Sequence, residues 1–288
     1  MNAISIRTLP PALQKLAISE VNEDPNRTES DIQALREWLK KQPHLRTDQW
    51  LLVFLRGCKF SLERSKEKLD MYYTLRAIVP EFFSNRDPLD AKIQEILKLG
   101  VFLPLKSCAK ADAPRPCLLG LGGFNPSQYH LSDLIKVSFM ITEILMVEDD
   151  HFAIAGEVII DLNGVGMNVI AQWTPAFAKK VTSCLEKSLP IRQRGNHILN
   201  TPIGFEAAYA IFQTFLSAKL KSRVSIKGIR VTFLLSTCLL VKLCSHRGHG
   251  ETEVLVVLLV DAVIVSKTTP FHILFFCSRF ISNFCKNN

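Results

Sequence analysis

The sequence contains no pair of cysteines at the C-x-x-C spacing of zinc and redox sites, and its eight cysteines are scattered along 288 residues. This pattern argues against a disulfide scaffold or a zinc cluster, and it fits the reducing environment of the cytoplasm. The first seventeen residues, MNAISIRTLPPALQKLA, contain no apolar run of signal-peptide length, so nothing in them supports secretion. No run of about 18 uncharged apolar residues precedes residue 228, and we expect that part of the chain to be soluble.

The sequence also lacks the short motifs of common catalytic and nucleotide-binding sites. It has no G-x-x-x-x-G-K-[ST] loop, no G-x-S-x-G elbow and no H-E-x-x-H motif. The segment GLGGF supplies Gly120 and Gly122, but Asn125 stands where G-x-G-x-x-G needs its third glycine, so a simple turn is the better interpretation. Nothing assembles a nucleophile, a base and an orienting group. We therefore expect neither an enzyme nor a cofactor.

Two polar segments have the residue types of metal sites without the full pattern. CSHRGH, with Cys244, His246 and His249, has no second ligand pair, and we interpret it as a loop. DLNG lacks the later acidic ligands of a calcium loop, so we interpret it as a strand-end turn in which Asp161 binds nearby backbone amides. The three acids at 148–150 are expected to end a helix in solvent. No metal site is predicted.

The chain does carry an excess of positive charge. It has 35 lysines and arginines against 27 acids, a formal net charge of +8 and a pI near 9.1. Such an excess favours an anionic partner (nucleic acid, an acidic membrane surface or phosphate), although it also suits an ordinary soluble protein. With 48% hydrophobic residues, the chain can bury one large core or two smaller ones.

Two textures of secondary structure follow one another along the chain. Residues 28–97 have helical periodicity, and the helical segments open on hydroxyl residues that can cap them: Thr28 or Ser30, then Thr47, then Ser61. After Gly100, the strand patterns PCLLGLGGF, EVIIDLNGV, NHILN and VSIKG alternate with helical segments, one of which opens on Thr174 and Pro175. This alternation predicts βαβ units with a mainly parallel sheet. Residues 229–288 are apolar, without helical periodicity, and hold four of the eight cysteines.

Basic residues flank an aromatic helix near the end of the alternating region. Arg192 and Arg194 precede NHILN, and the helix after it ends in Lys219, Lys221 and Arg223. That helix has an apolar stripe at helical spacing, formed by Phe205, Ala208, Tyr209, Phe212, Phe215 and Leu216. The stripe is typical of a core helix, and a solvated loop and the helix dipole explain the charges separately. Together they have the composition of an interfacial lipid-handling element.

An ordered series of segments, IIDLNG, TPAFAKK, LPIRQRG, ILNTP and LKSR, is more specific than any motif above. With LLVFLRGCKF and PRPCLLGLGGFNPSQY, it resembles the CRAL-TRIO lipid-binding family, and most closely its alpha-tocopherol transfer and cellular retinaldehyde-binding branch. The resemblance covers residues 28–228. It implies the following division of the chain: an N-terminal extension over 1–27, a helical module over 28–97, a C-terminally incomplete CRAL-TRIO α/β domain over 98–228 and an atypical apolar tail over 229–288.

The resemblance further implies that the mainly parallel sheet encloses an apolar pocket, gated by the helix in residues 204–221. The pocket positions that match are Ile135, Ser138, Thr142, Ile160, Val181, Cys184, Leu185, Leu189, Phe205 and Phe212. Ser138 and Thr142 lie four residues apart, so they can share a helix face, and back-bonding to the preceding turn is an equal alternative to contact with a ligand. The matching phosphoinositide-binding residues are Arg192, Arg194, Lys219 and Arg223. At Cys58 the family has a basic residue, and Lys59 is adjacent.

These observations predict a cytoplasmic carrier that associates peripherally with membranes and has no nucleic-acid partner. It would bind an apolar ligand, such as a tocopherol, a retinoid or a phospholipid, and exchange it at membranes containing phosphoinositides, including phosphatidylinositol bisphosphate. The alternative is a regulatory protein that senses phosphoinositides without transporting lipid. An enzyme such as an oxidoreductase ranks third, because the dinucleotide motif fails.

Overall fold

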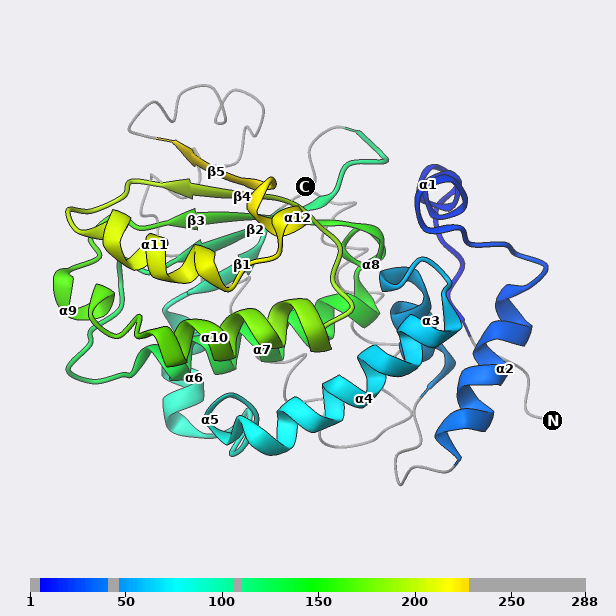
Figure 1. Ribbon diagram of the computed structural model, residues 1–288, viewed down its shortest axis with the longest axis horizontal. Helices are drawn as coiled ribbons and strands as arrows, with labels where there is room; N and C mark the ends of the chain where they lie inside the picture. The colour runs from blue at the N-terminus through cyan, green and yellow to red at the C-terminus, as the bar shows by residue number, and fades with distance from the viewer. Residues whose placement is uncertain (1–5, 41–46, 106–109, 228–288) are drawn as a thin grey trace.

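The computed structural model describes residues 6–40, 47–105 and 110–227. Figure 1 shows a twisted sheet with long helices beneath it and a group of N-terminal helices beyond one end. The predicted α/β architecture, with a helical N-terminal region and a mainly parallel sheet, is confirmed. The segment CSHRGH and the apolar tail lie outside the described residues.

The five-stranded sheet runs in sequence order, β1-β2-β3-β4-β5. Its strands are β1 (Phe102–Pro104), β2 (Arg115–Gly120), β3 (Gly156–Asp161), β4 (Gln193–Leu199) and β5 (Val224–Lys227). Only β1 pairs antiparallel, with β2, and the other neighbours are parallel. The sequence did not predict β1, because a three-residue strand ending in proline has too little alternation to detect.

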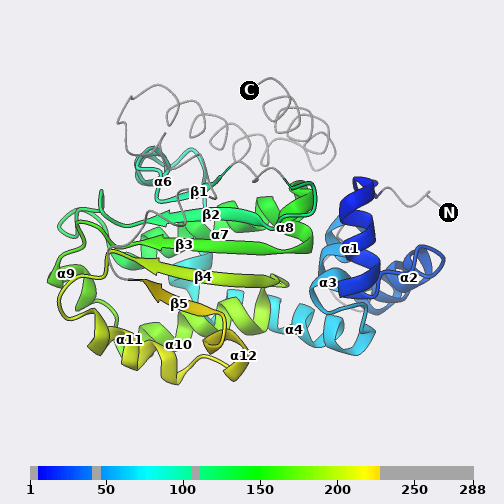
Figure 2. The ribbon, with the colours of Figure 1, turned by 90° about the horizontal axis from the view of Figure 1, so that it is seen from above.

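Two sets of helices surround this sheet. The N-terminal set contains α1 (Pro11–Val21), α2 (Thr28–Leu39), α3 (Asp48–Gly57), α4 (Leu62–Ile78), α5 (Pro80–Phe83) and α6 (Ala91–Lys98). The second set contains α7 (Leu131–Glu148), α8 (Asp150–Ile154), α9 (Met167–Ile170), α10 (Pro175–Ser183), α11 (Phe205–Thr214) and α12 (Ala218–Lys221). A π-helical turn (Cys184–Ser188) continues α10 and packs against α4. Seen from above, α10, α11 and α12 lie along the β5 side of the sheet, and α6 lies on the opposite side (Figure 2).

The capping residues predicted from the sequence are confirmed in part. Thr47 and Thr174 accept hydrogen bonds from the backbone amides of the third residues of α3 and α10, as predicted. Thr28 was wrongly predicted as a cap, because α2 begins at this residue and its hydroxyl donates to the carbonyl oxygen of Asp24. Ser61 does precede α4, but its side chain makes no capping hydrogen bond.

One continuous apolar core joins the N-terminal helices to the α/β region. Helix α3 contributes much of this core, with every residue from Trp50 to Arg56 buried. Arg56 is only 2% exposed, and its guanidinium binds both carboxylate oxygens of Glu23, at 2.8 and 2.9 Å. Helix α1 packs separately, on Ile154 of α8, so part of the predicted N-terminal extension is a folded element of the molecule.

The acids at the end of α7 were wrongly placed in solvent. Glu148 and Asp149 are buried, and Asp149 both caps α8 and binds the guanidinium of Arg115 at 2.9 Å. Burial raises the pKa of Glu148 to about 7, against the opposing charge of Arg7, whose Nη1 lies 3.5 Å from its carboxylate. Asp161 forms the predicted strand-end turn by accepting from the amide of Asn163. No helix in the described ranges is long and apolar enough to cross a membrane.

Candidate functional site

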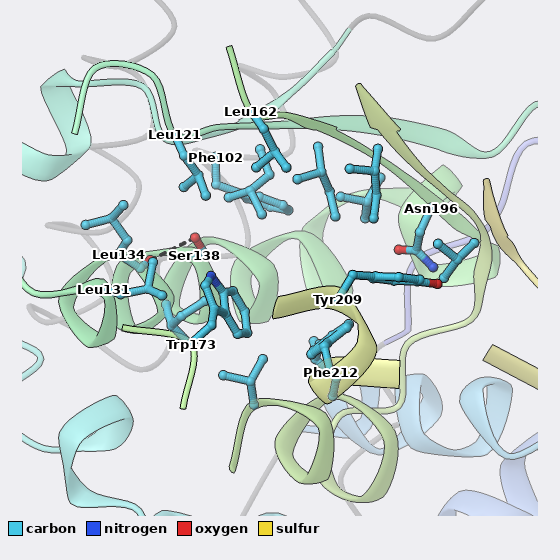
Figure 3. Close-up of a pocket in the computed structure, with 18 of the residues that line it drawn as sticks. Phe102, Leu121, Leu131, Leu134, Ser138, Leu162, Trp173, Asn196, Tyr209 and Phe212 are labelled. Atoms are coloured by element: carbon cyan, nitrogen blue, oxygen red, sulfur yellow. Dashed lines mark hydrogen bonds between the residues drawn. The ribbon is translucent and has the colours of Figure 1, made fainter. Parts of the chain in front are cut away.

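An apolar cavity of about 200 Å³ lies between the sheet and helices α7, α10 and α11. In Figure 3, Leu121 and Leu162 close it from the ends of the strands, and Leu131 and Leu134 of α7 face them. None of the described residues that line it is charged. Such a lining favours apolar molecules, because burying apolar surface contributes about 25 cal/mol per Å².

Eight of the ten pocket positions expected from the sequence line this cavity: Ile135, Ser138, Thr142, Ile160, Val181, Leu185, Phe205 and Phe212. Cys184 and Leu189 do not. Both are completely buried in the hydrophobic core, in or next to the π-helical turn that packs against α4. The cavity brings the eight residues together, and their contact with a ligand stays a prediction.

Helix α11 covers the cavity from the outside. Five members of its apolar stripe line the cavity: Phe205, Ala208, Tyr209, Phe212 and Leu216. No residue of α11 itself is fully buried, so this helix is held by one face only. Its main aromatic anchor is the contact of Phe212 with Trp173, whose ring centroids lie 5.4 Å apart. The helix begins after Gly204, whose φ of 85° disfavours residues with a Cβ.

A second, polar site lies beside the cavity. It is an open groove of about 710 Å³ between the end of α3, helix α4, the π-helical turn and α12. Seven basic residues line it: Lys59, Arg64, Lys68, Lys187, Arg192, Lys219 and Arg223. Among the described residues of the lining only Glu67 and Glu186 oppose them, which gives these residues a net charge of +5. The groove and the cavity share Leu185, Ile191, Gln193 and Leu220.

Three of the four predicted phosphoinositide-binding residues line this groove: Arg192, Lys219 and Arg223. The fourth, Arg194, lies next to it, and its guanidinium is paired with Glu20 of α1. The same carboxylate lies 3.5 Å from Nη2 of Arg192, whose Nη1 donates to the carbonyl oxygen of Ile154. Helix α1 therefore holds both arginines through one acidic side chain.

The charges in the groove affect one another. Partial burial lowers the pKa of Lys219, and the positive charges of Arg223, Lys59 and others lower it further. Burial likewise lowers the pKa of Lys68, whose ammonium donates to the carbonyl oxygens of Glu186 at 2.7 Å and Leu189 at 3.2 Å. The groove thus has a positive potential that favours an anion.

The sequence reasoning missed most of the α3–α4 wall of this groove. Arg64 and Lys68 lie four residues apart on α4, a spacing that puts both on one face and could have been noticed. The position of Lys59 depends on an uncommon backbone conformation. Its φ is 56°, in the left-handed region that residues with a Cβ rarely adopt. Cys58 also lines the groove, but it is buried, and its pKa is raised by that burial.

Comparison with known proteins matches two segments of the chain to protein families. Residues 24–93 match the family of Pinta-like UBA domains, and residues 112–231 match the CRAL/TRIO domain family. The "Alpha-tocopherol transfer protein-like" protein of Mus musculus is 32% identical over 220 residues, which cover 74% of this chain and 62% of that protein. The protein of the same name from Homo sapiens is 31% identical over the same shares of each chain.

A second group of relatives is more distant. "Clavesin-2" of Rattus norvegicus is 28% identical over 224 residues, covering 76% of this chain and 68% of that protein. Among solved structures, "Crystal structure of Sfh5" superposes with a TM-score of 0.45 at 11% identity, over 80% of this chain and 85% of that one. The chain spans 62% of the length of the alpha-tocopherol transfer protein-like relatives. The domain match over residues 112–231, together with these relatives, shows that the chain contains a CRAL/TRIO domain.

Proposed function

We propose that this protein is a cytoplasmic carrier that binds one hydrophobic molecule in the cavity and exchanges it at phosphoinositide-containing membranes. The observation that carries this proposal is the shared wall between the uncharged cavity and the basic groove. Leu185, Ile191, Gln193 and Leu220 line both. A molecule in the cavity and an anion in the groove would therefore touch the same side chains.

The cavity supports the first half of the proposal. Its lining has the apolar character of small-molecule sites, and it is closed by a helix that is held by one face. The names of the most similar proteins also favour a lipid-like cargo, because they include tocopherol transfer. The cargo class is therefore an apolar, lipid-like molecule.

The groove supports the second half. A net charge of +5 among the described residues of the groove, beside the cavity, suits the clustered phosphates of a phosphoinositide head group, with Arg192, Lys219 and Arg223 as contacts. Peripheral association of this kind needs no membrane-spanning segment, because charge and a shallow apolar contact suffice.

The cargo is tested by native mass spectrometry of the purified full chain, followed by extraction and identification of bound lipid. We expect one apolar molecule per chain. Ala208→Trp fills the cavity from α11 and should abolish the bound mass, whereas Ala207→Trp adds the same ring at an exposed position on the same helix and should retain it. Absence of bound lipid from both variants and from the wild type, after exposure to a lipid extract, would overturn the carrier function.

The membrane step is tested by cosedimentation with vesicles that contain or lack phosphatidylinositol bisphosphate. Arg192→Ala with Arg194→Ala should weaken binding roughly 30-fold, since each basic residue near such a surface is worth about 1 kcal/mol. Lys98→Ala with Lys110→Ala removes the same charge at exposed positions outside the groove and should have a small effect. Vesicle binding without bound cargo would favour the alternative, a phosphoinositide-sensing regulatory protein.

A further inference from the structure

Asn196 is a buried amide in an otherwise apolar cavity. It lies in β4, where it pairs with Val158 of β3 and Val224 of β5, and it is only 8% exposed. Its side chain lines the cavity, as does that of Ile198 two residues along the same strand face. The sequence predicted only that this residue belongs to a strand.

The hydrogen bonds of this amide are incomplete. An asparagine side chain offers two N–H donors and one carbonyl acceptor. In the described part of the chain its one hydrogen bond is a long one, from Nδ2 to Oε1 of Gln193 at 3.4 Å, and its carbonyl oxygen has no partner. A buried amide left in this state is costly, so the site favours a ligand that supplies the missing partner.

Tyr209 brings a second polar group to the same end of the cavity. Both residues line the cavity, and in the view of Figure 3 the hydroxyl end of Tyr209 points to the side where Asn196 lies. That hydroxyl makes no hydrogen bond to any other described residue, and burial raises the pKa of Tyr209, so it stays protonated and can donate. Together, the amide of Asn196 and the hydroxyl of Tyr209 offer hydrogen-bond donors and a carbonyl acceptor to a ligand in the cavity.

Two other polar side chains of the cavity, those of Ser138 and Thr142, differ from this pair. Ser138 donates its hydroxyl to the carbonyl oxygen of Leu134 at 2.8 Å, so the back-bonding alternative holds for this residue and it needs no ligand. Thr142 has a hydroxyl on the α7 side that forms no hydrogen bond to the described residues, but a hydroxyl is a smaller polar group than an amide. In the part of the chain that the structure describes, no charged side chain lines the cavity, so a carboxylate or an amine would be buried there without a counter-charge from these residues.

We propose that Asn196 and Tyr209 form the specificity-determining polar end of the cavity, and that the cargo is an apolar molecule with one neutral hydroxyl or carbonyl group. This inference rests on the proposed carrier function and narrows its cargo. The polar end of the cargo lies at the β4 side, next to the shared residue Gln193, and its apolar body lies along α7.

The test uses two labelled probes of equal length, hexadecanol and hexadecane, partitioned between cyclodextrin and the full-length protein. The quantity of interest is the preference for the alcohol over the alkane in each variant, divided by that of the wild type, so that differences in probe solubility cancel. Asn196→Leu keeps a similar volume and should reduce this preference about tenfold, without weakening hexadecane binding. Tyr209→Phe removes a single oxygen and should reduce it by a smaller factor.

Ser188→Ala is the matched control, because Ser188 does not line the cavity and its buried hydroxyl already donates to the carbonyl oxygen of Cys184, so the preference of this variant should equal that of the wild type. Thr142→Val separates the two sides of the cavity. If it removes the preference while Asn196→Leu and Tyr209→Phe keep it, the inference is overturned and the carrier function stands. If the wild type binds neither probe nor any extracted lipid, the carrier function itself fails.

Discussion

The contact of Glu20 with Arg192 and Arg194 makes a specific prediction about membrane binding. One carboxylate of α1 pairs with both guanidinium groups that we assign to the phosphoinositide head group. It therefore competes with an anionic lipid for the same cations. Glu20→Gln keeps the shape of the side chain and removes this competing charge, so the variant should bind phosphoinositide vesicles more tightly than the wild type.

The magnitude follows from the charges. Removing one negative charge beside the arginines is equivalent to adding one basic charge near the membrane, which is worth about 1 kcal/mol, or about fivefold in affinity. The cost to folding is small, because a partly exposed ion pair contributes about 0–1 kcal/mol to stability. The gain should shrink at high salt, where the Debye length falls to about 3 Å at 1 M.

The assay is cosedimentation with vesicles that contain phosphatidylinositol bisphosphate, at low and high salt. Glu29→Gln is the control, because it makes the same change at an exposed position on α2. Repeating Glu20→Gln in the Arg192→Ala, Arg194→Ala background should give no gain, since the competing pair is gone. An unchanged affinity of the folded single variant, or a full gain in the triple variant, would refute the reasoning.

Three further predictions concern stability. Glu23→Ala leaves Arg56 buried without its counter-charge and should lower the free energy of unfolding by about 3–5 kcal/mol in urea titration; a loss below 1 kcal/mol would contradict a buried pair. Because burial raises the pKa of Glu148 to about 7, the folded state binds the extra proton and stability from this group falls as pH rises from 4.5 through 7. Glu148→Gln should therefore raise the melting temperature at pH 8 and change it little at pH 4, and the reverse pattern would contradict this sign. Gly57→Ala would place a Cβ 2.3 Å from the carbonyl oxygen of Pro190, so it should lower the free energy of unfolding by about 1–3 kcal/mol in the same titration. An unchanged free energy of unfolding would show that the chain around Pro190 moves aside, and it would contradict this prediction.

The fold could be predicted from the sequence because its elements have strong local patterns. The aromatic stripe of α11 and the Thr174–Pro175 opening of α10 have the spacing that their positions in the structure require. The burial of Glu148 and Asp149 could not be predicted, because it depends on Arg7 and Arg115, which are far away in the sequence. An acidic run reads as a solvated helix end until its distant partners are known.

The candidate site, like the fold, could be predicted from the sequence only in part. Arg192 and Arg194, at the start of β4, and the cations after α11 were visible as a cluster, since they flank one strand–helix unit in the sequence. The pairing with Glu20 was not visible, because α1 reaches these residues only through the tertiary fold. Asn196 was hidden for a different reason: a single polar residue in a strand is ordinary, and only the cavity beside it shows that its amide lacks partners.

Helix α12 and the residues on either side of it line both the apolar cavity and the basic groove. Leu216 and Leu220 line the apolar cavity, whereas Lys219 and Arg223 line the basic groove. Leu220 also lines the groove, so the closing side chains and the anion-binding side chains lie on adjacent faces of one short segment. A head group bound by Lys219 and Arg223 would pull on the backbone that holds Leu220 against the cavity. Within residues 205–221 only Leu216 is buried, so such a movement would break few buried contacts, and anion binding and opening of the cavity can be coupled without a change in the sheet.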